Sequence, residues 1–168
     1  TVRLKQQTYS VPSKLIGLKL DAHVSESQVR FTYEGHEVCQ LPRMQGTKPQ
    51  IDYRHVITWL ARKPGAFRCY LYREEMFPTV VFRQAYDRLC ATEDRVADAR
   101  YLQLLELAAH HGESEVADLL GACLRAGEVP RPELIEVRLQ TERPAPSDLA
   151  PFVPDLKTYD SLLTEVSA

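Results

Sequence analysis

The chain has 168 residues, of which 44% are hydrophobic and 26% are charged, and its formal net charge at pH 7 is −2. This length and composition predict one ordinary domain or two small ones, and they exclude a wholly disordered chain. No leader pattern and no apolar run near ~18 residues is present, so we expect a cytoplasmic location and neither secretion nor a membrane span.

The two halves of the chain carry opposite charge. Residues 1–90 hold 14 Lys and Arg against 8 Asp and Glu, whereas residues 91–168 hold 7 against 15. This asymmetry favours a nucleic-acid surface in the first half and, in the second, a surface that avoids DNA or meets a basic protein partner. Chance segregation of solvated charges is the alternative.

Residues 1–50 show the alternation that is typical of half-buried strands. Apolar residues recur at every second position over 18–24 and 29–33, which is the period of a strand with one buried face. Glu34 and Gly35 predict a tight turn into a returning strand, and so a hairpin. Several short strands in 50 residues predict a small β-barrel.

From Asp52 the apolar period becomes helical, which predicts a helical module over 51–140. Asp52 can cap a first helix that ends before Pro64, and Thr79 and Ser114 can cap later ones. The apolar stripes predict these later helices around Phe82 to Leu89, Tyr101 to Ala108, Val116 to Leu124 and Pro132 to Leu139. The fold class is therefore mixed α+β, with a barrel followed by a compact helical module.

The last part of the chain predicts a tether and a docking segment. Residues 141–154 contain four prolines and scarcely any apolar period, which is typical of a stiff linker. Residues 155–168 carry an apolar stripe at helical spacing, which favours helix-in-groove binding to a partner protein. Packing of this segment on its own helical module is the alternative. We assign partner binding to Leu156, Tyr159, Asp160, Leu162 and Leu163.

Several short motifs occur along most of this chain. They lie at Thr8 to Pro12, Tyr53 to Ile57, Arg62 to Phe67, Tyr72 to Glu74, Met76 to Pro78, Phe82 to Leu89 and Leu156 to Leu163. Together they resemble the region that follows the catalytic domain in IstA-type insertion-sequence transposases, although at Met76 the family usually has leucine.

This resemblance implies an SH3-like, integrase-type barrel and a bacterial protein that associates with the nucleoid when bound to DNA. It implies that the Mg²⁺-dependent RNase H-like domain with its three carboxylates would lie upstream of Thr1. The implied partners are double-stranded DNA of the transposon ends, further copies of the transposase and a helper AAA+ ATPase of the IstB type.

The residues themselves predict no chemistry in this chain. The five histidines show no HxxxH or HExxH spacing, and the four cysteines show no CxxC, so we expect no metal site and reduced, buried cysteines. No phosphate-binding loop, dinucleotide fingerprint or GxSxG motif is present. We therefore expect no catalytic residue and no cofactor here.

What remains is binding, and the stretch 51–89 interleaves basic and aromatic residues. We expect His55 to be exposed beside phosphate, and we interpret Trp59 and Phe82 as core residues and not as base-stacking rings. The predicted DNA-binding residues are Lys14, Lys19, Arg30, Arg43, Lys48, Arg54, Arg62, Lys63, Arg68 and Arg73.

The predicted function is therefore that of a non-catalytic region of a transposase. It would bind transposon ends, help to assemble the synaptic complex and dock the helper ATPase. The alternative is a module for protein interaction or dimerisation with little direct DNA contact, and salt dependence of binding separates the two.

Overall fold

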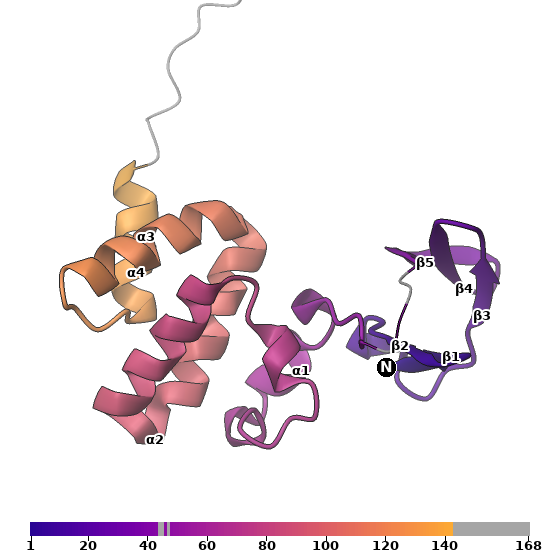
Figure 1. The fold of residues 1–168 in the computed structure, drawn as a ribbon, viewed down its shortest axis with the longest axis horizontal. Helices are drawn as coiled ribbons and strands as arrows, with labels where there is room; N and C mark the ends of the chain where they lie inside the picture. Colours follow the sequence, from indigo (N-terminus) through magenta and orange to yellow (C-terminus); the bar gives the residue numbers. More distant parts are fainter. Residues whose placement is uncertain (44–45, 47, 143–168) are drawn as a thin grey trace, which may run out of the picture.

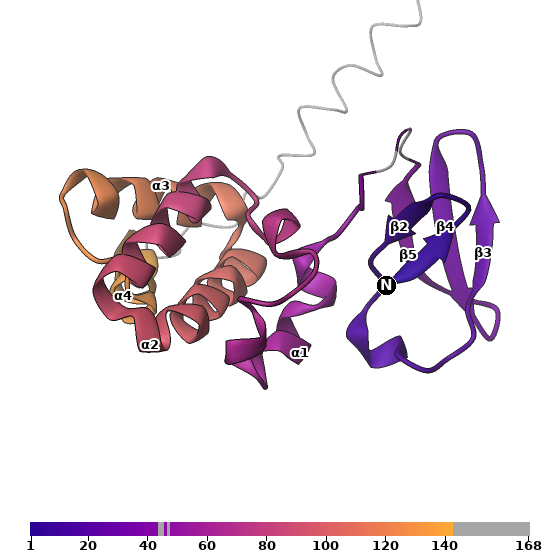
Figure 2. The same ribbon diagram turned by 60° about the horizontal axis from the view of Figure 1, so that its bottom comes forward.

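The computed structural model describes residues 1–43, 46 and 48–142 (Figure 1). Strands make up the N-terminal part and helices the remainder, and the short helix α1 (Ile57–Ala61) lies between the strands and the longer helices in both views (Figures 1 and 2). The predicted α+β class is confirmed.

Five short strands form the N-terminal part. Strands β1 (Val2–Leu4) and β2 (Gln7–Tyr9) pair antiparallel in one sheet. Strands β3 (Asp21–Val24), β4 (Gln28–Tyr33) and β5 (His36–Pro42) form a second antiparallel sheet in that order. Within the described residues no strand joins the two sheets, so the predicted barrel is not closed.

The predicted turn between the last two strands is confirmed. Glu34 and Gly35 have φ angles of 49° and 81°, and two successive positive φ values are what a tight two-residue hairpin turn requires. Gly35 adopts this angle without steric cost. The 3-10 turn η1 (Ser13–Leu15) separates the two sheets along the chain.

The two sheets enclose a small core of their own. Its buried residues are Tyr9, Val11, Val29, Phe31 and Leu41, and the rings of Tyr9 and Phe31 lie 6.1 Å apart. These side chains come from β2, β4, β5 and the segment after β2, so they hold the separate sheets against each other by apolar contact.

The predicted first helix is divided into two pieces. A 3-10 turn, η2 (Tyr53–His55), precedes α1. Asp52 caps this turn as predicted, because its carboxylate accepts a hydrogen bond of 2.9 Å from the Arg54 amide. Two further 3-10 turns follow, η3 (Pro64–Ala66) and η4 (Arg73–Met76).

The second and third predicted helices are confirmed as the two arms of the segment α2 (Val80–His111), which are separated at Glu93, where φ and ψ of −141° and 45° are not helical. The two arms fold back on each other, because the rings of Tyr86 and Tyr101 lie 5.1 Å apart. Thr79 occupies its N-cap position without a side-chain hydrogen bond. Ser114 does not cap the next helix, α3 (Glu113–Arg125), because it lies inside that helix. The last described helix is α4 (Pro132–Glu142), which begins at Pro132 as predicted.

The helical core contains a cluster of four aromatic rings: Phe67, Phe77, Tyr86 and Tyr101. Their centroids lie 5.1–6.1 Å apart in edge and tilted arrangements, which aromatic pairs prefer. Phe82 is fully buried as predicted, whereas Trp59 is 44% exposed. The interpretation of Trp59 as a core residue was wrong.

The four cysteines are free, as expected, but they are not uniformly buried. Cys123 is buried, Cys69 is exposed, and Cys39 and Cys90 are half-buried. Within the described part of the chain, no helix is both long enough and apolar enough to cross a membrane.

The strand core and the helical core share no residue, and the division into residues 1–50 and 51–140 stays a prediction. The predicted linker over 141–154 lies almost wholly outside the described residues, and the predicted docking segment over 155–168 lies entirely outside them.

Candidate nucleic-acid interface

The ten cations predicted to bind DNA fall into two groups in the structure. Six of them are exposed and take part in no ion pair with any residue that the structure describes. These six are Lys14, Lys19, Arg43, Lys48, Arg62 and Lys63. Exposed cations without an ion-pair partner can neutralise phosphate without breaking a salt bridge. Arg43 also donates a hydrogen bond of 3.2 Å to the Ser25 carbonyl.

The other four are engaged within the protein. Arg30 pairs with Glu37 at 3.0 Å, and Arg73 pairs with Glu74 at 2.9 Å. The guanidinium of Arg54 lies 2.7 Å from the carboxylate of Glu113 at the start of α3. Burial lowers the pKa of Arg54, but Tyr53, Glu113 and Asp52 together raise it above the usual range.

Arg68 is the most heavily engaged of these cations. Its guanidinium lies 2.6 Å from a carboxylate oxygen of Asp94 and 3.2 Å from one of Asp98. Hydrogen bonds to Asp94 and then Asp98 raise its pKa above the usual range. The Tyr86 hydroxyl donates to the same Asp98 carboxylate at 2.8 Å. Arg68 therefore fastens the connection after α1 to the middle of α2.

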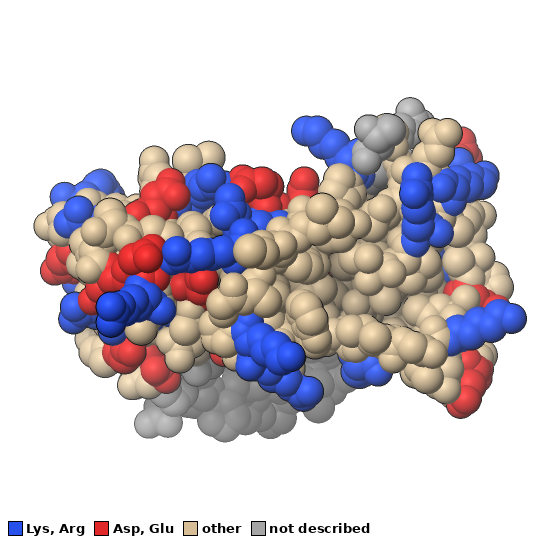
Figure 3. All heavy atoms as spheres, turned by 90° about the horizontal axis from the view of Figure 1, so that it is seen from below, with Lys and Arg blue, Asp and Glu red and all other residues tan. Residues whose placement is uncertain are grey.

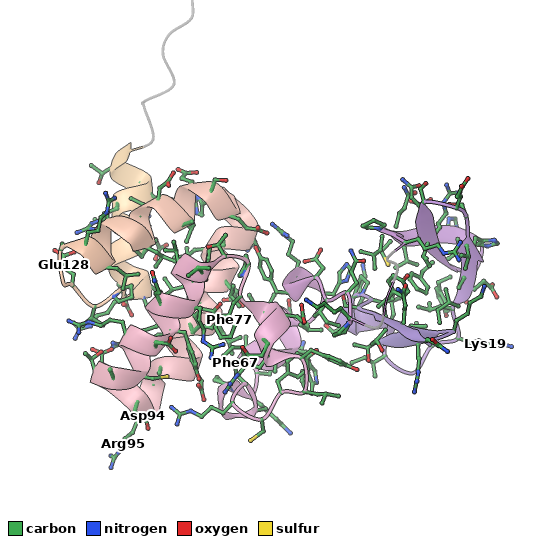
Figure 4. All side chains as sticks on the ribbon, in the orientation of Figure 1. Lys19, Phe67, Phe77, Asp94, Arg95 and Glu128 are labelled. Atoms are coloured by element: carbon green, nitrogen blue, oxygen red, sulfur yellow. The ribbon has the colours of Figure 1, made fainter. Side chains whose placement is uncertain are left out.

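The ten residues are not gathered on one surface. On the face seen in Figure 3, positive and negative side chains are interleaved over the helical part, and the centre of this face is largely uncharged. Lys19 projects from the outer edge of the strand part, away from the helices (Figure 4). Arg62 and Lys63 instead follow α1, where the strand and helical parts meet.

The turn after α1 presents Arg62 and Lys63 together. The Arg62 amide donates to the Trp59 carbonyl at 3.3 Å, and the Lys63 amide donates to the Leu60 carbonyl at 2.9 Å. Pro64 then begins η3, and a proline cannot continue the preceding hydrogen-bond pattern. Both side chains therefore leave a fixed turn, which suits contact with a phosphate backbone.

His55 was predicted to be exposed, but it is half-buried, so this prediction was wrong. Its Nδ1 lies 2.9 Å from the hydroxyl and 3.1 Å from the carbonyl of Ser10, and burial lowers its pKa below the usual value. The Ser10 hydroxyl also accepts a hydrogen bond of 2.8 Å from the Asp52 amide. His55 is therefore part of the junction between the strands and the helices.

An apolar hollow of about 150 Å³, which the sequence did not predict, lies at this junction. The interleaved aromatic and basic residues of 51–89 indicated this region as a binding candidate. The periodicity of the sequence did not show which of the aromatic rings stay at the surface. The strand part contributes Thr1, Val11, Ser13 and Ile16, and the helical part contributes Val56, Trp59, Tyr70 and Tyr72.

A larger hollow of about 490 Å³ lies at the end of the strand part where the turns gather. Lys5 and Arg43 contribute positive charge to its lining, and Glu26 contributes negative charge. Within residues 1–43, 46 and 48–142, no three His, Cys, Asp or Glu side chains are grouped so that they could hold a metal ion.

Residues 1–52 match the family described as Mu transposase, C-terminal domain. This match covers the five strands and ends at the Asp52 cap, so it corresponds to the strand part of the structure. The strand part is therefore similar to the C-terminal domain of a transposase. No solved structure matches the chain at a significant level.

Relatives extend the likeness through the helical part. The uncharacterized protein y4jA/y4nE/y4sE of Sinorhizobium fredii (strain NBRC 101917 / NGR234) is 34% identical over 134 residues, which cover 76% of this chain and 27% of that protein. The transposases for insertion sequences IS1326/IS1353 of Pseudomonas aeruginosa and Shigella flexneri are each 25% identical over 149 residues, which cover 84% of this chain and 28% of each relative.

Together these matches support the identification of this chain as a C-terminal region of an insertion-sequence transposase. The chain spans little more than a quarter of the length of these relatives. The names of these relatives carry no IstA-type assignment, so the resemblance to IstA-type transposases in particular stays a prediction.

Proposed function

We propose that this chain is a DNA-binding and architectural region of an IstA-type transposase, and that it grips transposon ends in the synaptic complex. The observation that carries the proposal is the division among the cations. Arg62 and Lys63 leave a fixed turn, are exposed and have no ion-pair partner among the described residues, and they belong to a chain that resembles transposases over most of its length.

The catalytic step is assigned to another part of the parent protein. The relatives are between three and four times as long as the aligned region, which leaves room for a catalytic domain elsewhere. There, three carboxylates would bind Mg²⁺ for strand transfer. The role proposed for this chain is to place DNA relative to that site, and it needs no cofactor of its own.

The proposed protein partners are further copies of the transposase and a helper ATPase of the IstB type. The support for helper docking is the amphipathic spacing of Leu156, Tyr159, Leu162 and Leu163 beyond a proline-rich stretch. Asp160 lies on the polar side of the same pattern. The acidic second half of the chain fits a partner with a basic surface.

The test of DNA binding is fluorescence anisotropy of a labelled transposon-end duplex titrated with the protein at several salt concentrations. The affinity should fall steeply with salt, and Arg62→Ala with Lys63→Ala should flatten the slope of log K against log salt by about 0.9 for each phosphate that these side chains neutralise. The matched control is Arg95→Ala with Arg125→Ala, which makes the same change of charge at two exposed cations in the acidic half.

If the control pair weakens binding as much as the Arg62 and Lys63 pair, the protein attracts DNA through net charge alone and the proposed interface is wrong. If the chain self-associates in a salt-insensitive way and does not bind duplex DNA, it is a dimerisation module instead.

Helper docking has a separate test. A labelled peptide spanning residues 144–168 is titrated with the helper ATPase, and the control peptide carries Leu156→Ala, Tyr159→Ala and Leu163→Ala. Saturable binding that disappears in the control supports docking through this segment. Equal binding of both peptides, or of neither, contradicts it.

A further inference from the structure

We propose that the apolar hollow at the junction receives one unstacked base of a DNA strand whose backbone lies along Arg62 and Lys63. Trp59, Tyr70 and Tyr72 provide the ring surfaces that line this hollow. The inference rests on the proposed DNA-binding function and adds a class of ligand to it. In addition to intact duplex, the chain would bind DNA ends that are single-stranded or frayed.

Trp59 is an exposed ring on a fixed support. Its side chain is 44% exposed, whereas Ile57 and Leu60 on the same short helix are 4% and 0% exposed. Burial of these two neighbours anchors α1 in the helical core and so sets the position of the indole. A rigid exposed aromatic ring offers a π-face on which any base can stack.

Tyr70 and Tyr72 are held in place by the turn around them. The Tyr70 amide donates to the Phe67 carbonyl at 3.1 Å, and the Arg73 amide donates to the Tyr70 carbonyl at 3.0 Å. The two tyrosine rings lie 5.9 Å apart in an edge arrangement. Phe67 is buried beside Phe77 in the helical core (Figure 4), so the turn that carries Tyr70 is attached to this core.

The charge around the hollow suits a polyanion. None of the residues that line it is Asp or Glu. Arg62 and Lys63 directly follow α1, and Lys14 follows Ser13, which lines the opposite wall. Cations beside exposed rings are the combination that single-strand binding surfaces use, since the cations hold the backbone while the rings hold the bases.

The size of the hollow favours a single ring over larger ligands. Its volume of about 150 Å³ lies below the roughly 300–1,000 Å³ that is typical of sites for small-molecule ligands. A docked amphipathic helix uses anchors at positions i, i+3 or i+4, and i+7 along an extended groove. A hollow of this volume is too small for that row of anchors, and a single ring suits it better.

Trp59 is the only tryptophan in the chain, so intrinsic fluorescence reports on this hollow directly. The test is to titrate the full chain with three oligonucleotides of equal length: a blunt duplex, the same duplex with a frayed end, and the single strand. We expect saturable quenching of Trp59 by the frayed and single-stranded forms and little quenching by the blunt duplex.

The variants are Trp59→Ala, Trp59→Phe and the matched control Leu71→Ala, which removes a side chain that is 82% exposed and does not line the hollow. Trp59→Ala should weaken binding of the frayed end about tenfold, within the range that removal of one stacking ring produces. Trp59→Phe should keep most of the affinity, and Leu71→Ala should match the unaltered protein. A fluorescence-independent electrophoretic mobility assay measures all three.

The outcomes separate this inference from the proposed function. Salt-dependent binding of all three oligonucleotides, with no quenching and no effect of Trp59→Ala, overturns the stacking site and leaves DNA binding intact. No binding of any oligonucleotide overturns both.

If Leu156→Ala with Tyr159→Ala shifts Trp59 fluorescence in the absence of DNA, the hollow holds the C-terminal segment and the inference is wrong. Should Trp59→Ala fail to fold, the fluorescence of the unaltered protein still decides, because the absence of quenching by the frayed and single-stranded oligonucleotides overturns the stacking site.

Discussion

The Nδ1 atom of His55 lies 2.9 Å from the Ser10 hydroxyl, although 45 positions separate the two residues in the sequence. Ser10 is fully buried and also accepts a hydrogen bond from the Asp52 amide. A parallel bridge between Tyr9 and Gln50 lies beside these contacts. This group of hydrogen bonds fixes the segment before α1 against the strand part, and so brings the two walls of the apolar hollow together.

Acidification is expected to weaken the folded state through His55. Burial lowers the pKa of this imidazole below its usual value of 6.5, so the unfolded chain takes up a proton at a higher pH than the folded chain does. The contribution of His55 to the free energy of unfolding is therefore fully present above pH 6.5 and is lost as the pH drops through the lowered pKa of the folded state. Urea unfolding at several pH values measures this decrease.

The matched variant is His55→Asn, because the Asn amide can occupy the position of Nδ1 without titrating. We expect a smaller decrease of stability between pH 7 and pH 5 in this variant than in the unaltered protein. An equal decrease in both proteins would mean that other groups, such as the carboxylates of the ion pairs, cause the dependence on pH.

Tyr86→Phe is expected to destabilise the protein by about 1.5–3 kcal/mol, because it removes a hydrogen bond to a charged group inside the fold. The Tyr86 hydroxyl donates to Asp98 at 2.8 Å, and Asp98 is 8% exposed. The control is Tyr33→Phe, since the Tyr33 hydroxyl makes no hydrogen bond with any described residue. Urea midpoints of the two variants are compared, and equal midpoints would show that Asp98 is satisfied by Arg68 alone.

Glu93→Ala is expected to destabilise the protein by roughly 1–3 kcal/mol, because it takes the shared carboxylate away from two cations. Glu93 lies at the kink of α2 and pairs with Arg100, and the Arg131 Nε donates to it at 2.8 Å. Arg95→Ala on the same helix removes an exposed cation and should change the stability by less than about 0.5 kcal/mol. Thermal unfolding, followed by circular dichroism, measures the stability of both variants. If Glu93→Ala is as stable as Arg95→Ala, the ion pairs of Glu93 do not stabilise the fold and apolar packing alone fixes the kink in α2.

Local pattern was enough to predict the elements that local chemistry determines. The turn at Glu34 and Gly35 and the cap at Asp52 depend on residues within a few positions of one another. The first hairpin was not predicted, because its strands have three residues each and Lys5 in its turn adopts a φ of 55°. A positive φ is uncommon for lysine, so no composition rule marks that turn.

The state of each cation could not be predicted in the same way. Arg68 meets Asp94 across 26 positions and Arg54 meets Glu113 across 59, and such partners are set by the packing of α2 and α3 and not by local sequence. Trp59 stayed at the surface because α1 has only five residues and buries one side. Charge and aromatic content therefore located the candidate segment, whereas the fold decides which side chains in it are free to bind.

Gly112→Ala is expected to destabilise the protein by roughly 1–3 kcal/mol, because Gly112 has φ and ψ of 108° and 142° at the junction of α2 and α3 and a residue with a Cβ is strained there. No atom lies within 4 Å of the added Cβ, so the cost comes from the backbone angle and not from a clash.

The matched control is Gly121→Ala inside α3, where φ is not positive and the added Cβ also meets open space. Alanine should stabilise this helix by about 0.5–1 kcal/mol, because glycine loses more backbone freedom on folding. Urea unfolding of the two variants should therefore move the midpoint in opposite directions. A Gly112→Ala midpoint equal to that of the unaltered protein would mean that the α2 to α3 junction relaxes to another backbone conformation, and that the packing of these two helices does not depend on this glycine.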